Sequence, residues 1–152
     1  MIRQPTHALA DLYMVDETAW LDAMAELIGS GRLSELDYVH LKEYLEDMAR
    51  RDRREVSSRL KVLLVHVLKW HYQKEMRTPS WQTTIDNQQD ELEFDMESGV
   101  LRNYAESSLA AIYEKAAKYA AGETGLPVKT FPPECPWTLE QLLSPEVLQN
   151  GD

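Results

Sequence analysis

The strongest constraint on the fold of this chain is a segment near its middle that is apolar on almost every side. Between Val62 and Leu68 the only polar residue is His66. A helix that is apolar nearly all round is buried against neighbours on several sides, so this segment predicts a central helix. Val56 and Leu60 extend the same stripe at helical spacing. Almost nothing in the chain alternates with period two, and we therefore predict an all-α fold.

Apolar spacing and capping residues predict the other helices. Asp16 is a good N-cap for a first helix, which Gly29-Ser30-Gly31 ends, and Asp37 caps a second. Asp52 and Glu55 resemble a capping pair that starts the central helix, and the alternative is one continuous, bent helix over residues 38–76. Thr78-Pro79-Ser80 starts a fourth helix, with Pro79 suited to its first position, and Ser98-Gly99 ends it. A fifth helix runs over about residues 100–121 and is ended by glycines.

A length of 152 residues favours a single domain. We expect a flexible N-terminal arm over residues 1–15, an antiparallel bundle of about five main helices within residues 16–143, and a C-terminal tail over residues 144–152. The proline-rich stretch before Thr138 is expected to form an extended clasp that Phe131 and Trp137 hold to the surface. Thr138 and Gln141 form a capping box that starts a short last helix.

Charge and cysteine content limit the possible environments. The chain has 16 basic and 26 acidic residues, and its net charge of −10 disfavours general nucleic-acid binding. Cys135 is the only cysteine, so an internal disulfide is impossible. No apolar run approaches the length of a membrane span, and the N-terminus lacks the apolar core of a signal peptide. We expect a soluble protein of the cytoplasm with no membrane partner.

Several motifs together resemble a known family. They are Leu63-Leu64-Val65-His66-Val67-Leu68-Lys69-Trp70, Ser80-Trp81-Gln82-Thr83-Thr84-Ile85 with Gln88, Glu123-Thr124-Gly125-Leu126-Pro127, and Phe131-Pro132-Pro133-Glu134-Cys135-Pro136-Trp137-Thr138 with Gln141 and Leu142. In this order they resemble the bacterial domain-of-unknown-function family twenty-nine, over about residues 16–143. The resemblance implies a compact helical bundle encoded by bacteria and no established activity. His71 stands where that family usually has Gln, and Tyr44 where it has a second Glu.

One candidate site joins Glu43 and Glu46 of the second predicted helix to His66 and Lys69 of the central helix. If those helices are antiparallel neighbours, the two pairs meet inside the bundle. Carboxylates and imidazole suit a metal ion or an acid–base pair. The alternative is a buried ion-pair network that sets helix register, and structural networks of this kind are commoner than sites.

A second candidate is a small-ligand pocket lined by Trp70, Trp81, Thr84 and Gln88. A Thr and a Gln on an otherwise apolar helical stripe need partners if they are buried, so an interhelical hydrogen bond is the simpler interpretation. His40 is interpreted as a surface residue, and Asp37 as a cap rather than a ligand.

A third candidate is a cationic strip. Residues 49–78 carry 9 basic and 3 acidic side chains, between flanks that carry 3 and 10 and then 4 and 13. The arginines from Arg50 to Arg59, near Trp70 and Tyr72, have the composition of a nucleic-acid patch. Internal pairing with the acidic flanks is the alternative that we favour.

No phosphate-binding glycine loop, catalytic triad or zinc spacing is present, and no cofactor can be named. The leading hypothesis is a non-catalytic interaction or scaffold protein that self-associates, with a further protein partner as a possibility. A metal-binding or small-ligand enzyme that uses Glu43, Glu46, His66 and Lys69 is the second hypothesis. Nucleic-acid binding through residues 50–59 is the third.

Overall fold

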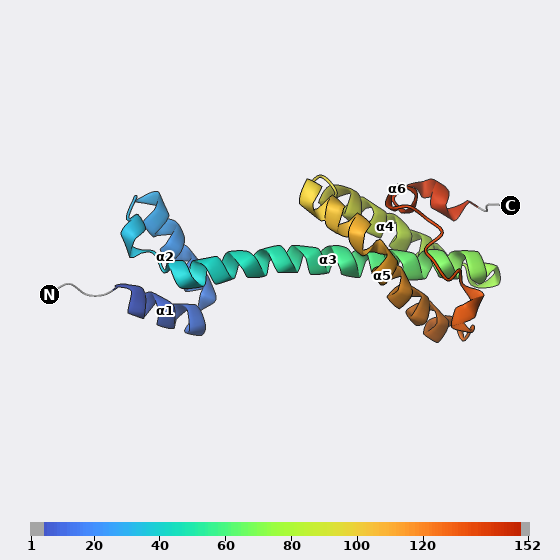
Figure 1. Cartoon of the computed structure of the whole chain (residues 1–152), viewed down its shortest axis with the longest axis horizontal. Coiled ribbons are helices and arrows are strands. Elements are labelled where there is room, and N and C mark those ends of the chain that lie inside the picture. Colours follow the sequence, from blue (N-terminus) through green and yellow to red (C-terminus); the bar gives the residue numbers. More distant parts are fainter. Residues whose placement is uncertain (1–4, 150–152) are drawn as a thin grey trace. The chain divides into compact units, whose positions relative to one another are not determined.

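The computed structural model describes residues 5–149, and of residues 5–7 it describes only the backbone (Figure 1). The prediction of an all-α fold is confirmed, since the described residues contain helices and no strand. The elements are α1 (Pro5–Val15), α2 (Glu17–Gly29), η1 (Leu33–Glu35), α3 (Tyr38–Tyr72), η2 (Lys74–Met76), α4 (Pro79–Asp95), α5 (Gly99–Thr124), η3 (Val128–Thr130), α6 (Leu139–Leu142) and η4 (Pro145–Leu148), where η marks a 3₁₀ turn.

The contacts divide the chain into two compact units, Met1–Arg50 and Arg51–Asp152, which we call the N-terminal and C-terminal units. The sequence predicts one domain over residues 16–143, whereas the contacts form two units. The difference arises because α3 contributes to two separate apolar clusters, one in each unit. Each unit is described by itself below.

The N-terminal unit contains α1, α2, η1 and the first turns of α3 (Figure 1). Its core consists of Trp20, Met24 and Leu36, with partly buried side chains packed around them. The predicted flexible arm is wrong for residues 5–15, which form α1, and residues 1–4 lie outside the described residues. The helix forms because Leu9, Leu12 and Tyr13 share one face and pack on the Trp20 cluster.

Helix α3 is continuous from Tyr38 to Tyr72, so Asp52 and Glu55 do not start a new helix. The two-helix prediction is wrong, and the open alternative of one continuous helix is correct, although the helix ends at Tyr72 rather than residue 76. Residues 49–55 contain neither Gly nor Pro, and their side chains are compatible with a helix interior. A capping pair satisfies the free backbone N–H groups at the start of a helix. Nothing in this segment interrupts the helix, so no such start exists here.

In the C-terminal unit, α4 and α5 pack against residues 51–72 of α3. The predicted central helix is confirmed, because its apolar side chains are fully buried, among them Val56, Leu60, Leu63 and Leu64. Pro79 lies in the first turn of α4, as predicted, and the Thr78 side chain caps the helix. Gly125 ends α5 with a φ of 74°, a left-handed backbone conformation that glycine adopts without strain.

The proline-rich clasp is held to the C-terminal unit by buried side chains and hydrogen bonds. Phe131 is buried, and Tyr113 donates its hydroxyl to the Pro132 carbonyl at 2.6 Å. Gln89 donates to the carbonyls of Leu142 at 2.8 Å and Ser144 at 3.0 Å. The predicted capping box that starts α6 is present. Of the predicted tail, residues 145–148 form η4 and its Val147 is buried, while residues 150–152 lie outside the described part.

No helix in the described part of the chain is both long and apolar enough to cross a membrane.

Candidate functional site

The predicted cluster of Glu43, Glu46, His66 and Lys69 does not form. The prediction required two antiparallel helices, whereas the four residues lie on one uninterrupted helix, which cannot fold back on itself. The two glutamates belong to the N-terminal unit, and His66 and Lys69 belong to the C-terminal unit. Within residues 5–149, no group of three or more His, Cys, Asp or Glu side chains is arranged to hold a metal ion.

Each member of that predicted cluster has its own surroundings. Glu46 pairs with Lys42 at 2.9 Å, and the His66 ring bonds the Val62 carbonyl at 2.8 Å. Burial raises the pKa of the Tyr13 hydroxyl, and the negative charge of the Glu43 carboxylate raises it further. Each of these contacts lies within one unit: those of Glu43 and Glu46 in the N-terminal unit, and that of His66 in the C-terminal unit.

Lys69 is the cluster member with the most enclosed charge. Its ammonium lies 4.5 Å from the centre of the Trp81 ring and 3.1 Å from a carboxylate oxygen of Glu123. The side chain is only 14% exposed. An indole face and a carboxylate together replace the water that the ammonium loses, so this is a satisfied structural contact rather than an open site.

The predicted pocket residues have separate partners. The Trp70 indole donates to the Leu148 carbonyl at 3.1 Å, and the Lys69 ammonium lies over the Trp81 ring. Thr84 donates to the Ser80 carbonyl of its own helix at 3.0 Å. The Gln88 side-chain oxygen is buried and has no hydrogen-bond partner within residues 5–149. These contacts share no common partner, and the neighbouring Gln89, which the sequence analysis did not single out, makes the interhelical bonds that we expected of Gln88.

The cationic strip is partly neutralised from within. Arg50 pairs with Asp47, and Arg59 pairs with Glu55 on its own helix. Arg59 also lies 3.4 Å from Glu91 and 3.5 Å from Asp95 of α4. Burial raises the pKa of the Asp95 carboxyl, and the nearby Arg59 guanidinium opposes that shift. The internal pairing expected of basic and acidic segments is therefore present at Arg59, whereas Arg51 and Arg54 are exposed.

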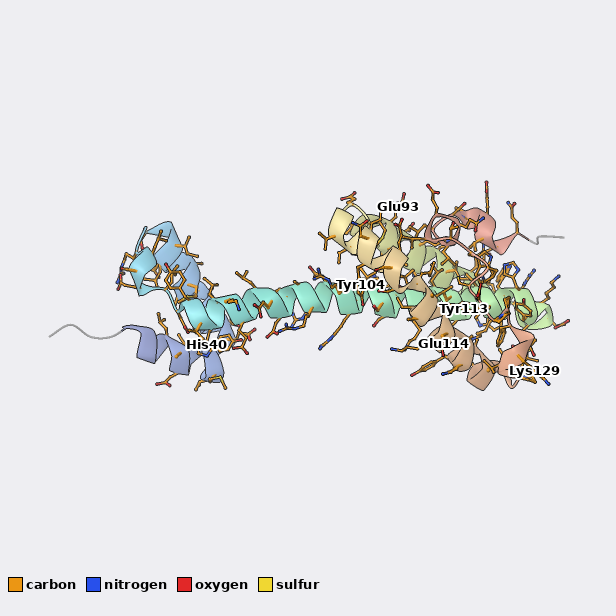
Figure 2. The ribbon with its side chains drawn as sticks, in the orientation of Figure 1. His40, Glu93, Tyr104, Tyr113, Glu114 and Lys129 are labelled. Carbon is orange, nitrogen blue, oxygen red and sulfur yellow. The ribbon has the colours of Figure 1, made fainter. Side chains whose placement is uncertain are left out.

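A buried polar network in the N-terminal unit was missed by the sequence analysis. Asp37 is 5% exposed and accepts hydrogen bonds from the Trp20 indole at 3.2 Å and from the His40 ring at 2.7 Å. It also caps α3 by accepting the His40 backbone N–H at 3.4 Å. Tyr13 stacks on His40 with ring centres 4.4 Å apart, and His40 is labelled in Figure 2. The predicted cap is confirmed, but His40 is partly buried, so its interpretation as a surface residue is wrong.

The N-terminal unit also exposes large apolar side chains. Val39 is 76% exposed and Leu45 is 60% exposed, although both lie on a helix of the unit's core. The full set in this unit comprises Met14, Val15, Ile28, Leu33, Tyr38, Val39 and Leu45. The described part of the unit thus exposes seven large apolar side chains around a core of Trp20, Met24 and Leu36.

Four of the exposed residues of α3 form one face, which we call the α3 stripe: Tyr38, Lys42, Leu45 and Ala49. Their spacing of four, three and four residues places them along one side of the helix. The Tyr38 hydroxyl donates to the Leu33 carbonyl at 2.6 Å, which holds the ring next to η1. Lys42 is the only charged member of the stripe, and its partner Glu46 lies one turn further along the helix.

The sequence profile of one family, described as domain of unknown function DUF29, matches residues 12–148. The chain belongs to the DUF29 family. The match covers α2 to η4 and reaches into both compact units, while most of α1 lies outside it. No curated protein and no solved structure matches this chain.

Proposed function

We propose that this DUF29 protein is a non-catalytic interaction protein that self-associates, and that the α3 stripe of one copy packs against the α3 stripe of a second. The observation that carries the proposal is the exposure of apolar side chains in the N-terminal unit, above all Leu45. Contiguous exposed apolar surface on a small folded unit is typical of an interaction site.

The small core supports the same proposal. A unit of about fifty residues buries a modest share of its surface, and such units often gain stability from association. Burying the exposed part of Leu45 contributes about 1–2 kcal/mol per copy, given roughly 2–3 kcal/mol for a fully buried Leu. Since a symmetric pair buries two copies of each residue, the contribution of this side chain doubles.

Charge favours a second copy as the occupant of the stripe. The N-terminal unit carries 4 basic and 10 acidic residues, yet the stripe itself contains no carboxylate. In an antiparallel pair whose two-fold axis passes near residue 44, Lys42 of each copy faces Glu46 of the other. The charges of Lys42 and Glu46 beside Leu45 are therefore self-complementary in such a pair.

The test is the oligomeric state of the full chain, measured by light scattering after gel filtration and by sedimentation equilibrium. We expect a dimer that Leu45→Glu dissociates, with the dissociation constant raised at least thirty-fold, because about 2 kcal/mol of burial is lost. Lys42→Glu and Glu46→Lys should each weaken the dimer, and the double exchange should restore it.

The matched control is Phe94→Glu, which places a carboxylate on another exposed apolar residue, 69% exposed, in the C-terminal unit. It should leave the dimer unchanged. A wild-type chain that stays monomeric at high concentration, or a dimer that Leu45→Glu does not weaken, would refute the proposal.

The other hypotheses have less support. A metal or acid–base site at Glu43, Glu46, His66 and Lys69 requires two antiparallel helices, whereas these residues lie on one continuous helix. Nucleic-acid binding has less support because Arg50 and Arg59 form ion pairs with acidic residues of the same chain. We retain the reducing bacterial cytoplasm as the proposed location, because Cys135 has no second cysteine with which to pair.

A further inference from the structure

A hollow of about 510 Å³ lies beside the C-terminal clasp, entirely within the C-terminal unit. Trp137, Glu140, Glu146 and Gln149 are among its lining residues, and no Lys or Arg lines it. Its volume lies in the range of small-molecule sites. The hollow thus combines an indole with two carboxylates.

The indole of Trp137 is only partly covered by the protein. The His71 ring stacks on it with ring centres 5.6 Å apart and an interplanar angle of 26°. His71 lines a second hollow, of about 320 Å³, together with Lys74 and Trp137. The larger hollow is also lined by Trp137, but by neither His71 nor Lys74.

Two other tryptophans of this unit have cations over their rings. The Arg77 guanidinium lies 4.4 Å from the centre of the Trp70 ring, and the Lys69 ammonium lies 4.5 Å from that of Trp81. At Trp81 the carboxylate of Glu123 completes the contact at 3.1 Å from the same ammonium. The protein therefore already contains the combination of indole, ammonium and carboxylate.

Trp137 has the indole and the carboxylates of that combination without a cation of its own. Within residues 5–149 no Lys or Arg lies over the Trp137 ring, and neither Glu140 nor Glu146 forms an ion pair. An indole face attracts a cation through its quadrupole, and nearby carboxylates add Coulomb attraction. Gln149 adds an amide that can hydrogen-bond a polar ligand group.

We propose that the hollow at Trp137 binds an organic ammonium group, held between the indole face and the carboxylates of Glu140 and Glu146. The group belongs to a free amine or to the lysine side chain of a partner protein, and both present the same chemistry to the site. The proposal concerns the C-terminal unit and does not depend on association through the α3 stripe.

The experiment follows the indole N–H signals of the full-length protein by two-dimensional NMR at constant ionic strength. The probes are tetramethylammonium chloride, a short peptide with one lysine, and the same peptide with that lysine trimethylated. We expect a saturable shift of the Trp137 signal alone, assigned by its absence from Trp137→Phe. Glu146→Gln should raise the dissociation constant about two- to five-fold, and Glu140→Gln combined with Glu146→Gln should raise it further.

The matched control is Glu93→Gln, which removes the same charge from an exposed glutamate of α4 that does not line the hollow (Figure 2). It should leave the dissociation constant unchanged. Tighter binding of either peptide than of tetramethylammonium assigns the site to a lysine side chain, and the reverse order assigns it to a small, free ammonium compound. Three results would overturn the proposal: a shift that sodium chloride reproduces, a shift that does not saturate, or an equal loss of affinity in Glu146→Gln and Glu93→Gln.

Discussion

Replacing Asp37 by alanine tests how the N-terminal unit is held together. The carboxylate accepts hydrogen bonds from the buried Trp20 indole, the His40 ring and the first turn of α3. Because Trp20 is fully buried, water cannot replace the lost acceptor. The variant therefore leaves an indole N–H unsatisfied inside the core of the unit.

The expected cost follows from two separate losses. A buried donor without a partner costs about 1–3 kcal/mol, and loss of an N-cap costs about 1 kcal/mol. The sum, about 2–4 kcal/mol, is a large share of the stability of a unit with so small a core. Since the C-terminal unit has its own apolar cluster, the N-terminal unit should open locally rather than with the whole chain.

Hydrogen–deuterium exchange read by mass spectrometry separates the two units. In Asp37→Ala the slowest amides of residues 17–48 should lose about thirty- to a thousand-fold of their protection, and those of residues 56–120 should keep theirs. Asp37→Asn, which keeps an acceptor oxygen and a good capping residue, should cost less. Asp47→Ala, which removes only a surface ion pair with Arg50, is the control for lost charge. A cost below about 0.5 kcal/mol, or equal loss of protection in both units, would refute this reasoning.

Two further predictions concern the clasp of the C-terminal unit. Burial, with a smaller contribution from Cys135, raises the pKa of Tyr113 to about 12, so its ionisation opposes folding. Because the unfolded chain ionises first, Tyr113 should contribute a loss of about 2 kcal/mol of stability between pH 10 and pH 12. Urea denaturation of Tyr113→Phe should lack most of this loss while costing about 1 kcal/mol at neutral pH, and an equal alkaline loss in both proteins would contradict the assignment. Gln89→Leu should cost about 1–3 kcal/mol and speed amide exchange in residues 139–149, because it removes the donor to two carbonyls. Gln82→Leu, an exposed position on the same helix, should do neither.

The α3 stripe could be predicted from the sequence in part, and the hollow at Trp137 could not. The heptad-like spacing of Tyr38, Lys42, Leu45 and Ala49 is visible in the sequence. Nothing local indicates that Leu45 is exposed while Leu41 and Met48 are partly buried, because that depends on where α1 and α2 pack. The hollow at Trp137 is harder still to predict, because its lining residues come from the clasp, α6 and η4, which are brought together only by packing.

The helical fold and most helix ends were determined by local sequence. Apolar spacing predicted α2, α4 and α5, and side-chain caps fixed their starts at Asp16, Thr78 and Ser98. Gly125 ended α5 for the same local reason, a backbone conformation that other residues adopt with strain. These features depend on residues within about one turn of each other, so they can be predicted without the tertiary structure.

The continuity of α3, the formation of α1 and the division into two units were decided by tertiary structure. A capping pair at Asp52 and Glu55 can satisfy a helix start but cannot create one, so continuity depends on the apolar clusters to which each part of α3 contributes. Tertiary structure also decided that Glu43 and Glu46 lie in a different unit from His66 and Lys69. It likewise placed Asp37 next to the indole of Trp20. Spacing determines which residues share a helix face, whereas burial and long-range packing determine what that face meets.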